Sequence, residues 1–190
     1  QDFVTGCYMG RRFFSGLLLA AVLCGVTGAG PARAEFTMTD RSGAWFFYTQ
    51  RGLGQGYAAC QVVSCLRGVC SSGTASRTQF SLYDARDGRG AMPEFISPQR
   101  ARSGATATLD IGGARFVLSN LFKSPQYYMM SRDRAQATEI VARLRGLEQA
   151  DSNAKFHVTD PQGRRHEFTV RGVSVSLDRM QSRCSPVSAE

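Results

Sequence analysis

Four cysteines carry the most definite chemistry in residues 35–190: Cys60, Cys65, Cys70 and Cys184. In an exported chain, an even number of cysteines implies a disulfide framework. Cys65 and Cys70 lie five positions apart, which suits a loop-closing disulfide and leaves Cys60 with Cys184. The spacing does not exclude the other two pairings of four cysteines. A redox site is the alternative, but the chain has no C-x-x-C motif, so structural disulfides are preferred.

Two histidines are the next candidates, and they lie on the two arms of an expected hairpin. His157 and His166 flank Pro161-Gln162-Gly163 and could face each other, and Glu167 is nearby. A metal site would need a third ligand at a useful angle, which this pattern does not supply. We therefore interpret both histidines as surface residues, and we expect no metal and no cofactor.

Motifs of common enzymes are absent from the sequence. It contains no G-x-S-x-G, no H-E-x-x-H and no Walker loop. Asp84 and Asp87 lie in a glycine-rich turn, where Asx turns account for them. The sequence therefore favours a protein that is not an enzyme.

Basic residues outnumber acidic ones, 23 Lys and Arg against 15 Asp and Glu, so the net charge is +8. A nucleic-acid interface would cluster these cations with stacking aromatic residues, but here they are dispersed and the aromatics follow strand patterns. We expect no nucleic-acid partner. The candidate basic binding surface is on the hairpin 155–171 and comprises Lys155, Arg164, Arg165 and Arg171. An envelope polyanion, a membrane surface or a protein is the expected partner.

The first 34 residues have the pattern of a secretory signal peptide. Met9 precedes two arginines, an apolar run of about 14 residues follows (too short for the ~20 residues of a membrane span), and Ala32-Arg33-Ala34 comes next. We expect a start at Met9, cleavage after Ala34 and a periplasmic or secreted bacterial protein; an uncleaved membrane anchor is the alternative. Without residues 1–34, 20 basic and 14 acidic residues remain, so the net charge becomes +6.

Residues 35–190 are expected to form a single domain that ends in a short tail, 185–190. Period-two patterns predict strands, and the Gly112-Gly113 pair predicts a hairpin turn. The expected strands span 43–50, 57–64, 78–83, 92–97, 105–111, 115–120, 126–131, 155–160 and 165–171, with Pro93 suited to an edge strand. A 3.6-residue period predicts one main helix over about 133–149, which Ser131 or Asp133 can cap.

A short second helix is expected to deliver Cys184 at the end of the domain. Because the strands do not alternate with helices, the pattern predicts a mainly β fold: a disulfide-stapled antiparallel β-sandwich or barrel-like domain with two helices.

The segments ATATLDIGGARFVLSN and KFHVTDPQGRRHEFTVRGVSVSLDRMQSRC resemble the invasion-associated locus B family, exported proteins of alphaproteobacteria. The matching features are the strand that ends at Val173, the Ser176–Arg179 segment and the late Cys184, with Trp45 and the Cys60 strand upstream. The resemblance implies an envelope-associated protein without catalytic residues. It also supports a Cys60–Cys184 pair, since early and late cysteines recur in the family.

Three functions follow from these patterns. The first is a non-enzymatic periplasmic or envelope-associated protein of the invasion-associated locus B type that binds at the cell envelope. The second is a secreted inhibitor or chaperone-like module that docks another protein through a sheet edge or through the hairpin 155–171. The third, and least favoured, is a thiol–disulfide or metal-dependent enzyme.

Overall fold

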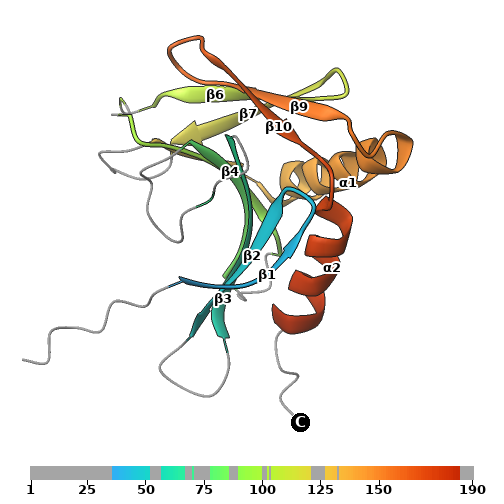
Figure 1. The fold of residues 1–190 in the computed structure, drawn as a ribbon. Coiled ribbons are helices and arrows are strands. Elements are labelled where there is room, and N and C mark those ends of the chain that lie inside the picture. Colours follow the sequence, from blue (N-terminus) through green and yellow to red (C-terminus); the bar gives the residue numbers. More distant parts are fainter. Residues whose placement is uncertain are drawn as a thin grey trace, which may run out of the picture. The chain divides into compact units, whose positions relative to one another are not determined.

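A long antiparallel sheet organises the protein (Figure 1). The computed structural model describes residues 36–51, 57–66, 70, 78–85, 90–99, 102, 104–120, 127–131 and 133–184, all of them in the compact unit Arg33–Glu190. Within these ranges, ten strands pair in the order β1-β2-β3-β4-β5-β8-β7-β6-β9-β10. The strands are β1 Phe36–Ser42, β2 Trp45–Arg51, β3 Tyr57–Cys65, β4 Gln79–Asp84, β5 Met92–Ser97, β6 Thr106–Ile111, β7 Ala114–Asn120, β8 Tyr127–Met130, β9 Lys155–Thr159 and β10 Arg165–Thr169.

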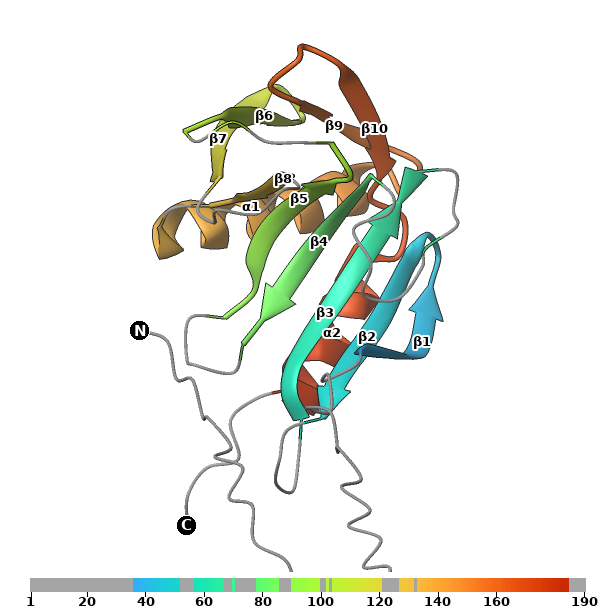
Figure 2. The same ribbon diagram turned by 90° about the vertical axis from the view of Figure 1, so that its left-hand side faces the viewer.

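The sheet bends so that its two ends face each other, as in a sandwich. Figures 1 and 2 show β9 and β10 lying across the top of the run from β2 to β5. Aromatic side chains from both ends meet between them: the Phe156 ring of β9 lies 5.0 Å from Phe80 of β4 and is stacked 6.3 Å from Trp45 of β2. We call the side of the sheet that faces this core the inner face and the opposite side the outer face. The expected mainly β, sandwich-like fold is confirmed.

Two helices complete the core on the inner face. Helix α1 spans Arg134–Ala150 and buries Ala137, Ile140 and Leu144, while α2 spans Val173–Cys184 and runs beside β1, β2 and β3. Asp133 caps α1, because its carboxylate accepts a hydrogen bond from the Gln136 amide at 2.7 Å. The predicted helix over about 133–149 is thus confirmed within one residue. Neither described helix is long and apolar enough to cross a bilayer.

Two tight turns are in contact where the two ends of the sheet meet. The amide of Ala44, in the β1–β2 turn, donates to the carbonyl of Arg171, in the turn between β10 and α2. The indole Nε1 of Trp45 donates to the carbonyl of Thr169 at 3.1 Å. Gly43 and Gly172 supply the positive φ angles, 56° and 94°, that these turns require. This junction closes the fold on itself.

The structure corrects two expectations about strands. Strand β1 was not expected, because an exposed edge strand needs no apolar alternation. Strand β5 was expected at an edge because of Pro93, but it lies between β4 and β8. The proline is tolerated because pairing with β8 begins only at Glu94, and the Pro93 carbonyl still accepts from the amide of Ser131.

Several sequence expectations lie outside the described residues. They are the start at Met9, the signal peptide and its cleavage after Ala34, the side chain of Asp87 and the tail 185–190.

Candidate functional site

Both expected disulfides are present, and they lie on opposite faces of the sheet. Cys60 in β3 joins Cys184 at the end of α2, with Cα atoms 6.2 Å apart and both residues buried in the inner core. Cys65 joins Cys70, with Cα atoms 5.3 Å apart, and packs in a second cluster on the outer face. The first disulfide links residues 124 positions apart, so it ties the C-terminal helix to the middle of the sheet.

Two of the four expected binding cations on the hairpin are neutralised. Lys155 forms an ion pair with Glu167 on the neighbouring strand. Arg164 holds the buried Asp160 through Nε at 2.8 Å and Nη2 at 2.6 Å. Burial would raise the pKa of Asp160, but the hydrogen bonds from His166, Arg164 and backbone amides outweigh it and lower that pKa. Arg164 therefore stabilises the turn of the hairpin through its contacts with Asp160.

The other two cations, Arg165 and Arg171, stand at opposite ends of β10. Each is exposed and forms no ion pair with the described part of the chain. Arg165 begins β10, whereas Arg171 follows its last residue, Thr169, by two positions and lies in the turn before α2. The candidate basic binding surface on the hairpin therefore stays a prediction: two of its four cations are held in ion pairs, and the other two have no such partner among the described residues.

His157 and His166 point to opposite faces of the hairpin. The expectation that they could face each other is therefore wrong. In the β9–β10 register, His157 lies opposite Glu167 and His166 lies opposite Val158. His157 Nε2 is 3.3 Å from Glu167 on the outer face. On the inner side, the Nε2 of His166 lies 3.0 Å from the Asp160 carboxylate. Among the described residues, no three metal-ligating side chains converge.

Instead, cations gather along β1 and α2, which the sequence analysis did not recognise. Arg179 of α2 donates to Asp40 of β1 at 3.0 Å and to the carbonyl of Arg41 at 3.2 Å. Arg171 lies two residues before α2, and its carbonyl accepts from the amide of Ala44 in the β1–β2 turn. Helix α2 therefore runs along β1 and brings distant arginines to the same edge of the sheet (Figure 1).

Two more arginines of this region are held over aromatic rings. The guanidinium carbon of Arg41 lies 4.8 Å from the centroid of Phe46, and that of Arg183 lies 5.6 Å from the centroid of Phe47. Neither arginine forms an ion pair within the described ranges.

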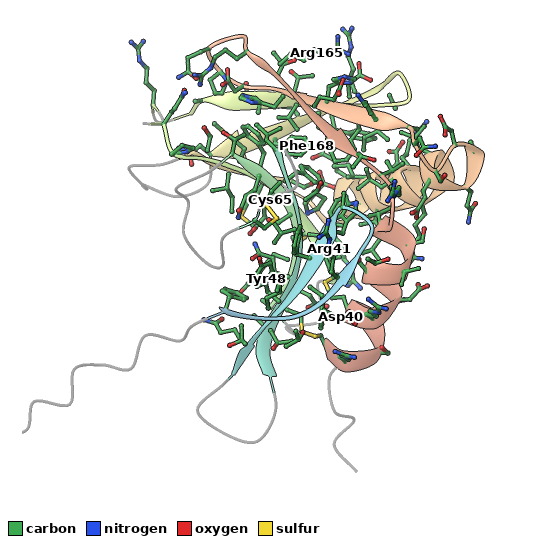
Figure 3. The ribbon with its side chains drawn as sticks, in the orientation of Figure 1. Asp40, Arg41, Tyr48, Cys65, Arg165 and Phe168 are labelled. Atoms are coloured by element: carbon green, nitrogen blue, oxygen red, sulfur yellow. A yellow bond between two sulfur atoms is a disulfide. The ribbon has the colours of Figure 1, made fainter. Side chains whose placement is uncertain are left out.

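We call Arg41, Arg171, Arg179 and Arg183 the basic edge. Asp40 is the acidic partner within it, so three of its four positive charges have no ion-pair partner among the described residues. In Figure 3, Arg41 and Asp40 lie beside β1, well away from Arg165 at the top of the molecule. Arg179 and Arg183 are four residues apart, so the sequence alone could have placed them on one face of a helix. Only the packing of α2 on β1 adds Arg41 and Arg171 to them.

A buried polar group lies on the outer face of β3, β4 and β5. Glu94 is 7% exposed, and Ser81 donates to its Oε2 at 3.0 Å. The Nε2 of Gln61 lies 3.0 Å from Ser81 Oγ and 3.3 Å from the same carboxylate oxygen. Burial raises the pKa of Glu94 to about 7, against the lowering effect of these two hydrogen bonds. The sequence analysis missed this group, since nothing in M-P-E-F-I-S marks the carboxyl as buried.

Protein-family models, curated proteins and solved structures yield no significant match to this chain.

Proposed function

We propose that this chain is a non-enzymatic, disulfide-stapled binding protein of the bacterial periplasm or envelope, of the invasion-associated locus B type. The basic edge, which presents along β1 and α2 three arginines with no ion-pair partner among the described residues, is the observation that carries the binding role. The two disulfides support an oxidising compartment, where such bonds form and persist. The resemblance at residues 105–184 supports the family and the envelope.

The partner of the basic edge is an anionic component of the envelope, represented by an acidic phospholipid surface. Arginine guanidinium groups bind phosphate oxygens through parallel hydrogen bonds, which suits each of the three exposed cations. Each cation near an anionic membrane contributes about 1 kcal/mol of binding free energy. Because these charges are exposed, the attraction weakens as salt is added.

Vesicle binding tests this function. We expect the protein to bind vesicles of acidic phospholipid at low salt, to release them at high salt and to ignore zwitterionic vesicles. Replacing two arginines of the basic edge (Arg41→Gln with Arg183→Gln) should weaken binding roughly 30-fold, the equivalent of about 2 kcal/mol. The matched control is Arg115→Gln with Arg143→Gln, which removes the same charge from sites paired with Asp110 and Glu139. Equal losses in both double variants would mean that only net charge matters and would sink the assignment to the basic edge.

A second function, a module that docks another protein, is favoured by one observation. Strand β1 has a strand neighbour on one side only among the described residues, and its Met38 is 54% exposed. An open edge of this kind can pair with an extended segment of a partner. A photo-crosslinking residue at position 38 should then capture a protein in the cell, while the same residue at position 115 should not.

A further inference from the structure

A cavity of about 230 Å³ lies between α1, α2 and the chain that enters β5. Helix α1 lines it with a single stripe, Arg134, Thr138, Val141 and Arg145, whose members recur about once per turn. It is separate from the basic edge, since α2 turns a different set of residues toward it.

The wall of the cavity is largely apolar. Val141 faces Leu177 and Met180 of α2, and Ala91 contributes from the β5 side. Leu177 and Met180 are also part of the buried core, so this wall is held by packing. Methionine adapts to the shape of a bound group, because its side chain is unbranched and flexible. The volume exceeds that of an apolar cavity of about 150 Å³ that admits benzene, so a small aliphatic chain fits.

Among the described residues that line the cavity, one positive charge has no ion-pair partner. Arg145 is neutralised by Asp178 of α2 at 2.7 Å, and Asp84 has an interaction of its own. Arg134, in contrast, is exposed and forms no ion pair with any residue that the structure describes. It is also the first residue of α1, directly after the N-cap Asp133, whose carboxylate accepts from the Gln136 amide. A cation there is unfavourable for the helix itself, because the amino end of a helix dipole is positive.

We propose that this cavity binds a small aliphatic carboxylate. The hydrocarbon chain packs against Val141, Leu177 and Met180, and the carboxylate pairs with Arg134. The chain of such a ligand removes the apolar wall from water, and its carboxylate compensates the charge of Arg134. This site is independent of the proposed function, because none of its residues belongs to the basic edge.

A titration with octanoate, followed by ¹⁵N–¹H NMR, tests the site. We expect saturable shifts of the backbone amides of Arg134, Val141 and Leu177, with a dissociation constant on the order of 1 mM, as suits a ligand of this size. Octanol, which has the same chain without the charge, should bind more weakly at the same amides. Absence of saturable shifts, or shifts confined to other parts of the chain, would overturn the proposal.

Two variants separate the charge from the apolar wall. Arg134→Gln should weaken octanoate binding up to about fivefold and leave octanol unchanged, since it removes only a partly exposed ion pair. Val141→Trp should fill the cavity and abolish binding of both. The matched control is Arg143→Gln on the same helix, which is paired with Glu139 and does not line the cavity. If Arg143→Gln weakens octanoate binding as much as Arg134→Gln does, the specific role of Arg134 is wrong. This comparison does not depend on whether the tryptophan variant folds.

Discussion

Glu94 shows how far the surroundings of one residue alter its chemistry. The side chain is buried on the outer face, where Ser81 and Gln61 donate hydrogen bonds to its carboxylate. These two bonds do not offset the loss of water, so the pKa rises to about 7. The folded protein therefore keeps a proton on Glu94 in a pH range where the unfolded chain has lost it.

This difference makes stability depend on pH. The contribution of Glu94 is fully present below the pKa of the unfolded chain, about 4.5, and is lost as pH rises to about 7. The full loss is on the order of 3 kcal/mol, since one pKa unit corresponds to about 1.4 kcal/mol. Chemical unfolding of the Glu94→Gln variant and the parent protein, measured from pH 4 to pH 8, checks it. We expect the variant to gain about 3 kcal/mol relative to the parent over that range, because glutamine does not titrate. A difference that stays constant with pH would contradict the role of Glu94.

At the scale of elements, the β1–β2 turn approaches the turn that precedes α2 so closely that a Cβ atom at Gly43 or Gly172 would overlap the opposite backbone. The Arg171 carbonyl accepts a hydrogen bond from Ala44, and Glu148 of α1 accepts from the amides of Gly172 and Ser174. The two bonds that Glu148 accepts satisfy amides at the start of α2 that the helix itself leaves without partners. Burial would raise the pKa of Glu148, but the hydrogen bonds from Ser174 and the neighbouring backbone outweigh it, so the pKa is lowered. The contact orients α2, and with it the basic edge.

Adding a methyl group at this contact should therefore be costly. A Cβ atom at Gly172 would overlap the carbonyl of Ser42, and its φ of 94° is already unfavourable for other residues. We expect Gly172→Ala to lower the free energy of unfolding by about 3 kcal/mol, through strain and overpacking together. Gly163→Ala is the matched control: its φ is 78°, but nothing lies within 4 Å of the added atom. It should cost only about 1 kcal/mol, and urea titrations of both variants measure the two costs. Equal costs would show that the close approach is unimportant.

At the scale of the whole molecule, the sheet closes on itself and the long disulfide holds that closure. Rings from β2 and β4 pack against rings from β9, which comes more than 60 residues later in the chain. Cys60 and Cys184 then link β3 to the end of α2 across 124 positions. Both features bring remote segments together, so the bond restricts the unfolded chain strongly.

The two disulfides should differ in their effect on stability. In the chain-entropy model, the bond across 124 positions contributes about 5 kcal/mol and the bond across five about 2 kcal/mol. We expect Cys60→Ala with Cys184→Ala to lower the melting temperature much more than Cys65→Ala with Cys70→Ala. A disulfide map of the non-reduced parent protein is the companion measurement. Any pairing other than these two would contradict the structure.

Much of the fold could be predicted because its signals are local. The Gly112-Gly113 turn, the Asp133 cap and the alternation in β6 and β7 each depend on neighbours in the sequence. The cysteine spacing favoured the pairs that the structure forms. The hairpin 155–171 was predicted as a hairpin, but not the ion pairs that neutralise its cations, because register alone decides which charges stand opposite each other.

The sequence by itself determined the class of the protein: mainly β, with a main helix over about 133–149, an excess of arginine and an even number of cysteines, four, in residues 35–190. Only the tertiary structure decided where those arginines act. The basic edge, the buried carboxyl of Glu94 and the cavity beside Arg134 each join residues from strands and helices that are far apart in the chain. The physical reason is that charge, burial and cavities depend on which faces pack together, and no local pattern encodes that packing.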